Sequence, residues 1–352
     1  MRVLIVADDL TGALDSAVAL VGAGLTCVVA RRPADVPAAL AMQPDVLSVS
    51  TASREGDAGA ARAAVAAVLA AAGPLPPLVV KKVDSRLKGH VADEVAVLAG
   101  HAGYHHALVA PAIPAQGRTV VAGRLIGAGV AAPIDVAAAL AGSGLEVVVP
   151  DVSTDADLDG ALAALAGGPP TLLVGAAGLT AALARRLSPG RWAMPVPRLQ
   201  APVLLAIGSR DPITLAQVDR LVATGWAAVT PAPDGLCPAG AGGRGVLRMV
   251  AGGGAFDARA AGERFAEGIA QLVRAEGVGT LLGCGGETAD AILGALGQGV
   301  LVIDGEVLPG MPVSGMVVDG RRVQLVTKSG GFGAVDALVA MVAAAEAGER
   351  TR

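Results

Sequence analysis

The fold is decided by residues 2–24, RVLIVADDLTGALDSAVALVGAG, at the start of the chain. Val3–Ala7 is a short apolar run with β-branched residues, which predicts a strand buried on both faces. The next apolar side chains recur at helical spacing, so we expect a helix that takes its cap hydroxyl from Thr11 and stops at Gly22 or Gly24.

Asp8 and Asp9 stand between this strand and this helix. In an open parallel sheet, ligands bind at the edge where strands end, and a helix N-terminus favours anions. The loop could therefore hold both a proton acceptor and a negatively charged substrate. A second interpretation, in which the two carboxylates only cap the helix, stays open.

Length and composition exclude several classes of protein. A chain of 352 residues predicts two domains. With 27 basic residues, 31 acidic residues and 2% aromatic residues, no nucleic-acid surface is expected. The hydrophobic fraction of 53% makes a membrane protein worth testing, but Gly167–Pro170 breaks the longest uncharged run, Gly160–Ala184. We therefore expect no membrane-spanning segment.

Cysteine usage predicts the compartment. Cys27, Cys237 and Cys284 lie far apart without metal-type spacing. This fits a reduced cytoplasmic protein without structural zinc or disulfides, in which the cysteines are small buried hydrophobes. Asp8 and Asp9 also follow the N-terminus too closely for a secretory signal.

Strand-like and helix-like segments alternate along both halves, which predicts an α/β fold of two domains, each with a largely parallel, doubly wound sheet flanked by helices. Four prolines interrupt the alternation in 188–202, so the linker is expected there, between domains 1–190 and 200–352. In the first half, the expected strands are 45–50, 78–83, 106–110, 145–149 and 171–174, and the expected helices are 58–72, 91–98, 158–165 and 179–187. In the second half, the expected strands are 203–207, 225–230, 245–250, 278–282, 300–303, 316–318 and 323–326, and the expected helices are 213–222, 256–276, 289–296 and 334–345.

Two glycine-rich turns in the second half follow expected strands and open helices. They are 283–288, GCGGET, and 327–333, TKSGGFG. Such backbone amides approach a phosphate closely, and the helix end adds positive potential. One such turn alone often marks only a tight bend, but two in one domain favour phosphate binding. No GxxxxGK[ST] motif occurs, which excludes the ordinary P-loop, and the GxGxxG at Gly240–Gly245 precedes a strand rather than a helix.

In the first half, charged and hydroxyl side chains collect at four successive strand ends. Parallel strand ends converge on one edge even when they are distant in sequence. Arginine can bind a carboxylate through two parallel hydrogen bonds, and serine, threonine and aspartate suit sugar hydroxyls. Any single cation here could be a solvated surface residue, but the set indicates a ligand site. The residues are Asp8, Asp9, Ser53, Arg54, Lys82, Asp84, Ser85, Lys88, Arg118 and Thr119.

A polyhydroxy acid on one domain and phosphates on the other predict phosphoryl transfer across a shared cleft. That chemistry needs a carboxylate to orient or deprotonate the attacking hydroxyl, cations on the transferring group and glycine amides around it. Asp9 is the first candidate for the base and Asp84 the second. We expect Mg²⁺ to be bound mainly by ATP phosphates, with an aspartate or Glu287 as a further contact.

Motifs of one known family occur in order along nearly the whole chain. They are IVADDLTGALD at 5–15, KKVDSRLKG at 81–89, APAIPAQGRT at 110–119, DVSTDADL at 151–158, VGAAGL at 174–179, GGETA at 285–289 and TKSGGFG at 327–333. Through them the chain resembles the four-carbon acid sugar kinases. The resemblance implies an N-terminal domain that binds the acid sugar, a C-terminal domain that binds ATP, and a 4-phosphate of threonate, erythronate or oxo-tetronate as product.

The resemblance also implies which residues line the two sites. The implied sugar site contains Asp8, Asp9, Ser53, Arg54, Lys82 and Arg118. The implied ATP site contains Ser209, Gly285, Gly286, Glu287, Thr288, Lys328, Gly330 and Gly331.

The chain departs from the family at several positions. It is shorter than expected between the linker and Phe256, Asp211 stands where a small hydroxyl residue is expected, and Lys88 and His90 replace an arginine and an asparagine. Two other functions are considered: an NAD(P)-dependent hydroxy-acid dehydrogenase, against which the missing fingerprint after Val6 counts, and a non-catalytic sensor of acid sugar and nucleotide. The stereochemistry of the acid and the oligomeric state, a homo-oligomer included, stay open.

Overall fold

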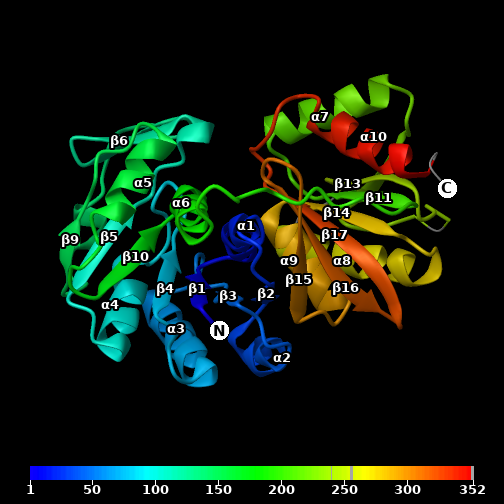
Figure 1. Ribbon diagram of the computed structural model, residues 1–352. Helices are drawn as coiled ribbons and strands as arrows, with labels where there is room; N and C mark the ends of the chain where they lie inside the picture. Colours follow the sequence, from blue (N-terminus) through cyan, green and yellow to red (C-terminus); the bar gives the residue numbers. More distant parts are fainter. Residues whose placement is uncertain (239, 254–256, 350–352) are drawn as a thin grey trace. The chain divides into compact units, whose positions relative to one another are not determined.

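The computed structural model of the protein describes residues 1–238, 240–253 and 257–349. The chain divides into two compact units, Met1–Met194 and Pro195–Arg352 (Figure 1). Each unit is a largely parallel sheet flanked by helices, so the predicted α/β fold class is confirmed. Among the described residues, no helix is both long enough and apolar enough to cross a membrane.

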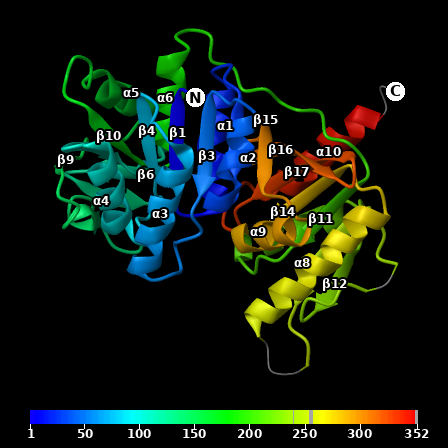
Figure 2. The ribbon, with the colours of Figure 1, turned by 90° about the horizontal axis from the view of Figure 1, so that it is seen from below.

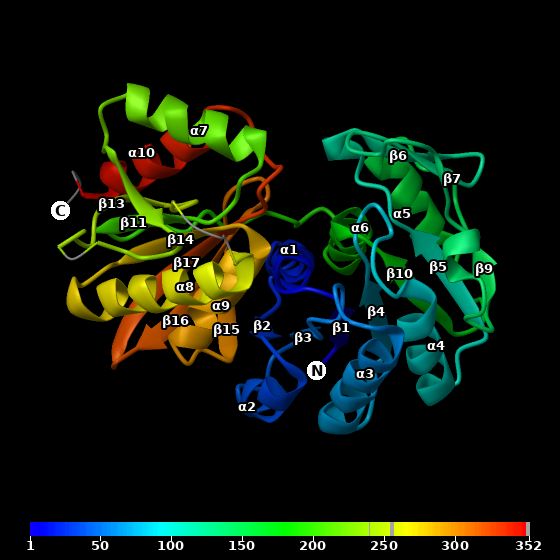
Figure 3. The ribbon, with the colours of Figure 1, turned by 180° about the vertical axis from the view of Figure 1, so that it is seen from behind.

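The first unit is built on one parallel sheet. Its strands are β1 (Val3–Ala7), β2 (Cys27–Ala30), β3 (Val46–Ser50), β4 (Leu78–Lys82), β5 (His106–Ala110), β9 (Glu146–Val148) and β10 (Thr171–Gly175). Its helices are α1 (Leu10–Val21), α2 (Val36–Ala41), α3 (Ala58–Ala72), α4 (Val91–Ala102), α5 (Asp155–Ala163) and α6 (Ala177–Leu187). The strand order is β2-β3-β1-β4-β10-β5-β9. Helices α1 and α6 cover one face and α3 and α4 the other, which is why β1 is apolar and buried along its whole length (Figures 1 and 3).

The topology of this sheet positions a ligand site at the ends of β1 and β4. Strand β1 lies between β3 and β4 (Figure 2). In the register of these pairs, Val6 is opposite Val49 on one side and Lys81 on the other. The chain leaves β1 toward β2 on one side of the sheet and leaves β4 toward β5 on the other. Such a reversal is the topological switch point at which open α/β sheets bind ligands, beyond the carboxyl ends of the strands.

The cap of α1 differs from the prediction. Asp9, and not Thr11, is the N-cap residue: its backbone is extended, with φ −144°, and its side chain accepts a hydrogen bond from the Gly12 amide. Thr11 is already inside the first helical turn, where its hydroxyl cannot cap, and it donates to Asp9 instead. The helix ends at Gly22, one of the two expected stops.

Three features of the first unit were not expected from the sequence. They are β2, helix α2 and a 3-stranded antiparallel sheet of β6 (Arg118–Val121), β7 (Arg124–Gly127) and β8 (Ile134–Asp135). Arg118 was expected at the end of the strand now named β5, but it opens β6. The turn at Gly117, with φ +66°, reverses the chain before it and so separates Arg118 from β5.

The second unit contains a mixed sheet in the order β12-β13-β11-β14-β17-β16-β15, in which β16 runs antiparallel to both of its neighbours, β17 and β15, and the pairs from β12 to β17 are parallel. Its strands are β11 (Val203–Ile207), β12 (Val229–Pro233), β13 (Gly245–Val250), β14 (Thr280–Cys284), β15 (Val300–Leu308), β16 (Met311–Val318) and β17 (Arg321–Lys328). Its helices are α7 (Pro212–Ala223), α8 (Ala258–Ala275), α9 (Gly286–Ala295) and α10 (Ala337–Glu349). Helices α7 and α10 lie on one face and α8 and α9 on the other (Figure 3).

One hydrophobic core cluster of the second unit lies between its sheet and the α7–α10 pair. Leu205, Ile207, Leu221, Leu338 and Met341 are buried there, each worth about 1.5–3 kcal/mol when removed from water. Several expected bounds changed in this unit. The strands expected at 225–230 and 278–282 are shifted to β12 and β14, and β15, β16 and β17 are longer than expected. The last helix, α10, begins at Ala337 and not at 334, and the expected helix start at 256 lies outside the described residues.

Candidate active site

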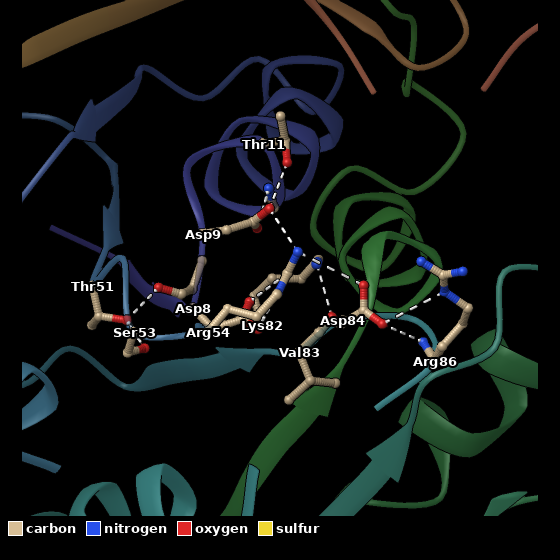
Figure 4. A network of polar contacts seen from close by, with 12 residues as sticks. Asp8, Asp9, Thr11, Thr51, Ser53, Arg54, Lys82, Val83, Asp84 and Arg86 are labelled. Carbon is tan, nitrogen blue, oxygen red and sulfur yellow. Dashed lines mark hydrogen bonds and ion pairs between the residues drawn. The ribbon is translucent and has the colours of Figure 1, made fainter. Parts of the chain in front are cut away.

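Two carboxylates that follow β1 are bound by one arginine (Figure 4). Asp8 is buried, and Arg54 donates to it from two nitrogen atoms, Nε to Oδ2 and Nη2 to Oδ1, both at 2.8 Å. The third nitrogen of Arg54, Nη1, donates to Oδ2 of Asp9, also at 2.8 Å. Arg54 comes from the loop after β3, so side chains from the ends of two neighbouring strands meet here.

Asp9 caps helix α1 and also belongs to the polar cluster around Arg54. Its Oδ1 accepts from the Gly12 amide at 2.8 Å, and its Oδ2 accepts from the Thr11 hydroxyl at 2.6 Å as well as from Arg54. A Cβ atom on Gly12 would lie 2.9 Å from Nζ of Lys82, so the absence of a side chain there lets this amine approach the loop. The cap interpretation therefore holds for Asp9 without excluding a role in a site.

The charges around Asp8 keep it ionised. Burial by itself would raise the pKa of this carboxyl, but the hydrogen bond from Arg54 and the positive charges of Lys81, Arg54 and Lys82 outweigh burial, so the pKa lies below its ordinary value. A bidentate arginine is the strongest form of such an ion pair.

Lys82 and Asp84 reach the same cluster from the end of β4. The Nζ atom of Lys82 is buried and donates to the Val83 carbonyl at 2.8 Å. Asp84 Oδ2 lies 3.8 Å from Nη1 of Arg54, and its Oδ1 accepts from the Arg86 amide at 2.9 Å. Asp84 thus keeps most of its acceptor positions open.

The Ser53 hydroxyl points into a buried network. Its Oγ donates to Glu94 Oε1 and shares a hydrogen bond of 2.7 Å with the Thr51 hydroxyl. The Ser53 amide donates to the Asp8 carbonyl at 3.0 Å. Ser53 therefore joins the polar cluster through its backbone while its side chain is bonded to the protein interior.

The sequence analysis missed the ion pair beneath this network. Lys81 is fully buried, with Nζ 3.0 Å from Oε2 of Glu94, which is 1% exposed. Glu94 falls on the apolar stripe of α4 with Val91, Val95 and Leu98. A carboxylate on such a stripe was the available signal, because buried charges are retained only when they are paired.

Arg118 lies close to the Asp84 loop although it comes from the small sheet. Its Nη1 donates to the Ser85 hydroxyl at 2.8 Å and to Gln116 Oε1 at 2.7 Å, and its Nε donates to the Ala128 carbonyl at 2.8 Å. The first unit thus brings together the side chains of Asp8, Asp9, Arg54, Lys82, Asp84, Ser85 and Arg118, and Ser53 joins them through its backbone. It adds Arg86, which the sequence analysis did not select.

In the second unit, three glycine turns meet at the carboxyl ends of β11, β14 and β17. A Cβ atom on Gly208 would strike the Thr288 side chain, and one on Gly330 would strike the Ser209 hydroxyl. Gly285, with φ +104°, donates its amide to the Lys328 carbonyl at 2.9 Å. These turns therefore pack closely against one another, and the Thr288 and Ser209 side chains fill the space that a side chain at Gly208 or Gly330 would need.

The buried side chain of Lys328 is hydrogen-bonded to the turn that contains Ser329 and Gly330. It is 1% exposed, and its Nζ donates to the carbonyls of Ser329 at 3.0 Å and Gly330 at 3.2 Å and to the Thr214 hydroxyl at 3.4 Å. Burial lowers its pKa, while the charges of Cys284 and Asp211 oppose that shift. Lys328 therefore places a buried positive charge directly under the turn.

The remaining predicted residues border the same turns. Gly286 is the first residue of α9, Glu287 is exposed in its first turn, and Gly331 lies against Asp211, which caps α7. Asp211 accepts from the Ile213 amide at 2.9 Å, which explains why an acid suits this position. Within the described residues, no cluster of three or more histidine, cysteine, aspartate or glutamate side chains could hold a metal.

Comparison with known proteins agrees with this division into two parts. Residues 3–135 match the family model of a sugar-binding N-terminal domain, and residues 247–338 match that of a nucleotide-binding C-terminal domain. A solved structure from Salmonella typhimurium LT2 shares the fold, with a TM-score of 0.77 at 19% identity, and covers 97% of this chain and 98% of that one.

Curated relatives extend over the whole chain. A D-threonate kinase of Cupriavidus necator is 33% identical over 409 aligned positions, covering 96% of both proteins. A D-threonate kinase of Bordetella bronchiseptica is also 33% identical, covering 95% of both. A 3-oxo-tetronate kinase of Cupriavidus necator is 29% identical and covers 56% of this chain. The chain therefore belongs to the four-carbon acid sugar kinase family of enzymes.

Proposed function

We propose that this protein is an ATP-dependent kinase that phosphorylates a four-carbon sugar acid at its terminal hydroxyl, with D-threonate as the first substrate to test. One observation carries the proposal: carboxylates neutralised by arginine and lysine lie at the switch point of a sheet that matches a sugar-binding domain. The two D-threonate kinases at 33% identity support the choice of acid.

The second unit fits the phosphates of ATP. Its three turns lie at strand ends where a side chain at Gly208 or Gly330 has no room. Helix α9 begins at Gly286, and the amides of a first helical turn have no partner within the helix. Backbone amides and a helix N-terminus are the usual partners of phosphate groups, and the buried charge of Lys328 adds to their potential. Mg²⁺ would supply charge neutralisation on the phosphates, and Glu287 and Asp211 are the carboxylates beside these turns that could contact it.

Asp9 is the proposed base for the attacking hydroxyl. A carboxylate offers about four acceptor positions, and Asp9 uses three of them on Gly12, Thr11 and Arg54. The remaining position can accept the hydroxyl proton and orient its oxygen for in-line attack. Asp84 is the second candidate, since it is less engaged.

Asp9→Asn and Asp84→Asn separate the two candidates. Asparagine caps a helix as well as aspartate does, so Asp9→Asn keeps α1 intact. We expect ADP release with D-threonate to fall by about 10²–10⁴ in kcat for Asp9→Asn, while ATP binding measured by calorimetry is retained. The same fall for Asp84→Asn alone would move the role to Asp84.

The wild-type protein decides among the three functions. ADP release is measured with a panel of tetronates and oxo-tetronates, and reduction of NAD(P)⁺ is measured with the same acids. Tetronate-dependent ADP release supports the kinase. Binding of acid and ATP without turnover would support a sensor, and acid-dependent NAD(P)⁺ reduction would support a dehydrogenase.

A further inference from the structure

Arg54 is not free to bind the carboxylate of a substrate. Its Nε and Nη2 atoms form the fork that grips a carboxylate in two parallel hydrogen bonds, and Asp8 already occupies that fork. Its remaining nitrogen serves Asp9 and faces Asp84. If the substrate is an acid, another cation must neutralise it.

Arg118 and Arg86, unlike Arg54, have guanidinium nitrogen atoms that can still bind the carboxylate of a substrate. All hydrogen bonds of the Arg118 side chain go to uncharged oxygen atoms, and among the described residues it makes no ion pair and its Nη2 no hydrogen bond. Arg86 keeps its Nε 4.0 Å from Oδ1 of Asp84, the outer limit of an ion pair, and its side chain is 40% exposed.

The two guanidinium groups converge on one point. A Cβ atom on Gly129 would lie 3.8 Å from Nη2 of Arg118 and 3.9 Å from Nη1 of Arg86. Gly129 has φ +75°, a conformation that favours glycine, so the space beside both cations stays open. Burial and the neighbouring charge of Arg86 lower the pKa of Arg118, as expected for two cations without a full counter-charge.

We propose that Arg86 and Arg118 bind the carboxylate of the sugar acid and so direct its terminal hydroxyl toward Asp9. Figure 4 shows Asp84 between Arg54 and Arg86, so Asp84 stands between the carboxylate end and the reacting end of the substrate. Its open oxygen positions suit the hydroxyls in the middle of the chain. This assignment rests on the proposed function, and it names the feature that selects an acid over a neutral polyol.

The test compares D-threonate with threitol, the uncharged polyol with the same carbon chain. Arg86→Gln and Arg118→Gln are measured beside Arg124→Gln, which removes an exposed arginine from β7 in the same small sheet. We expect each of the first two variants to raise KM for D-threonate about tenfold to a hundredfold, the loss typical of a charge-assisted hydrogen bond. The inhibition constant of threitol, KM for ATP and kcat should stay within about threefold.

Three outcomes would overturn the assignment: an unchanged KM for D-threonate, an equal loss of D-threonate and threitol binding, or the same rise in KM for Arg124→Gln. Calorimetry with D-threonate keeps the assignment separate from the kinase proposal. If the wild type binds the acid without turnover and both variants lose this binding, the kinase proposal is refuted and the carboxylate site is supported. No binding of D-threonate or any other tetronate to the wild type would refute the site.

Discussion

Lys81→Met tests whether the buried ion pair supports the candidate site. Nζ of Lys81 bonds Glu94 at 3.0 Å and the carbonyls of Lys82 and Val6 at 3.0 and 3.4 Å, and the side chain is 0% exposed. Methionine fills a similar volume without the charge. The Glu94 carboxylate would then be buried with the Ser53 hydroxyl as its hydrogen-bond partner.

The expected cost follows from the burial of both charges. Removing one partner of a buried ion pair typically costs about 3–5 kcal/mol, because the other charge stays in a medium of low polarity. A domain of this size loses roughly 2–4 °C of melting temperature per kcal/mol, so the unfolding transition of the first unit should fall by roughly 6–20 °C. Scanning calorimetry measures this transition.

Two further variants make the test specific. Adding Glu94→Leu to Lys81→Met removes the orphaned charge and should recover most of the loss. Arg62→Met breaks an exposed pair with Asp93 at 3.3 Å, next to Glu94 on α4, and should cost less than about 1 kcal/mol. A fall for Lys81→Met no larger than that for Arg62→Met, or no recovery in the double variant, would refute the argument from buried charge.

Three further predictions concern charge and thiol chemistry. Arg54→Gln removes the partner that lowers the pKa of Asp8. A lowered carboxyl pKa adds to the free energy of unfolding above the usual carboxylate range, and this contribution is lost as pH falls. The difference in urea unfolding between wild type and Arg54→Gln should therefore be largest near pH 7 and shrink toward pH 3. Burial lowers the pKa of Lys328, so at alkaline pH the unfolded chain binds more protons than the folded one. The free energy of unfolding should therefore rise with pH up to about 10.5 in the wild type, and this rise should be absent in Lys328→Met. Burial raises the pKa of Cys237 to about 11, so a disulfide reagent at pH 8 should react slowly until the protein is unfolded.

The sequence predicted best those elements whose signals are local. Ala58–Ala72 is rich in the strongest helix former, and it is helical over the whole expected range. Val203–Ile207 and His106–Ala110 are bounded by turn residues and begin and end where expected. Since parallel strands carry their loops to one edge, the clustering of polar loop residues also followed from the order of the elements.

Features that depend on distant partners could not be predicted. β2 has only four residues and no alternation, and it is a strand because β3 pairs with it. β6 to β8 are short and pair with one another through turns that contain glycine. Glu94 carried a local signal, but its partner Lys81 lies on another element and is recognised only in three dimensions.

The same limit applies to the charges of the site, because a sequence shows which charges gather but not which ones neutralise each other. Three carboxylates and four cations surround the ends of β1 and β4: Asp8, Asp9 and Asp84 against Arg54, Lys82, Arg86 and Arg118. Their formal charges are three negative and four positive, so one positive charge stays without a counter-charge among these seven side chains. A tetronate carries one negative charge, and a neutral polyol carries none. Electrostatic balance therefore favours an acid in this site, and it assigns the balancing role to the guanidinium groups that the protein's own carboxylates leave open.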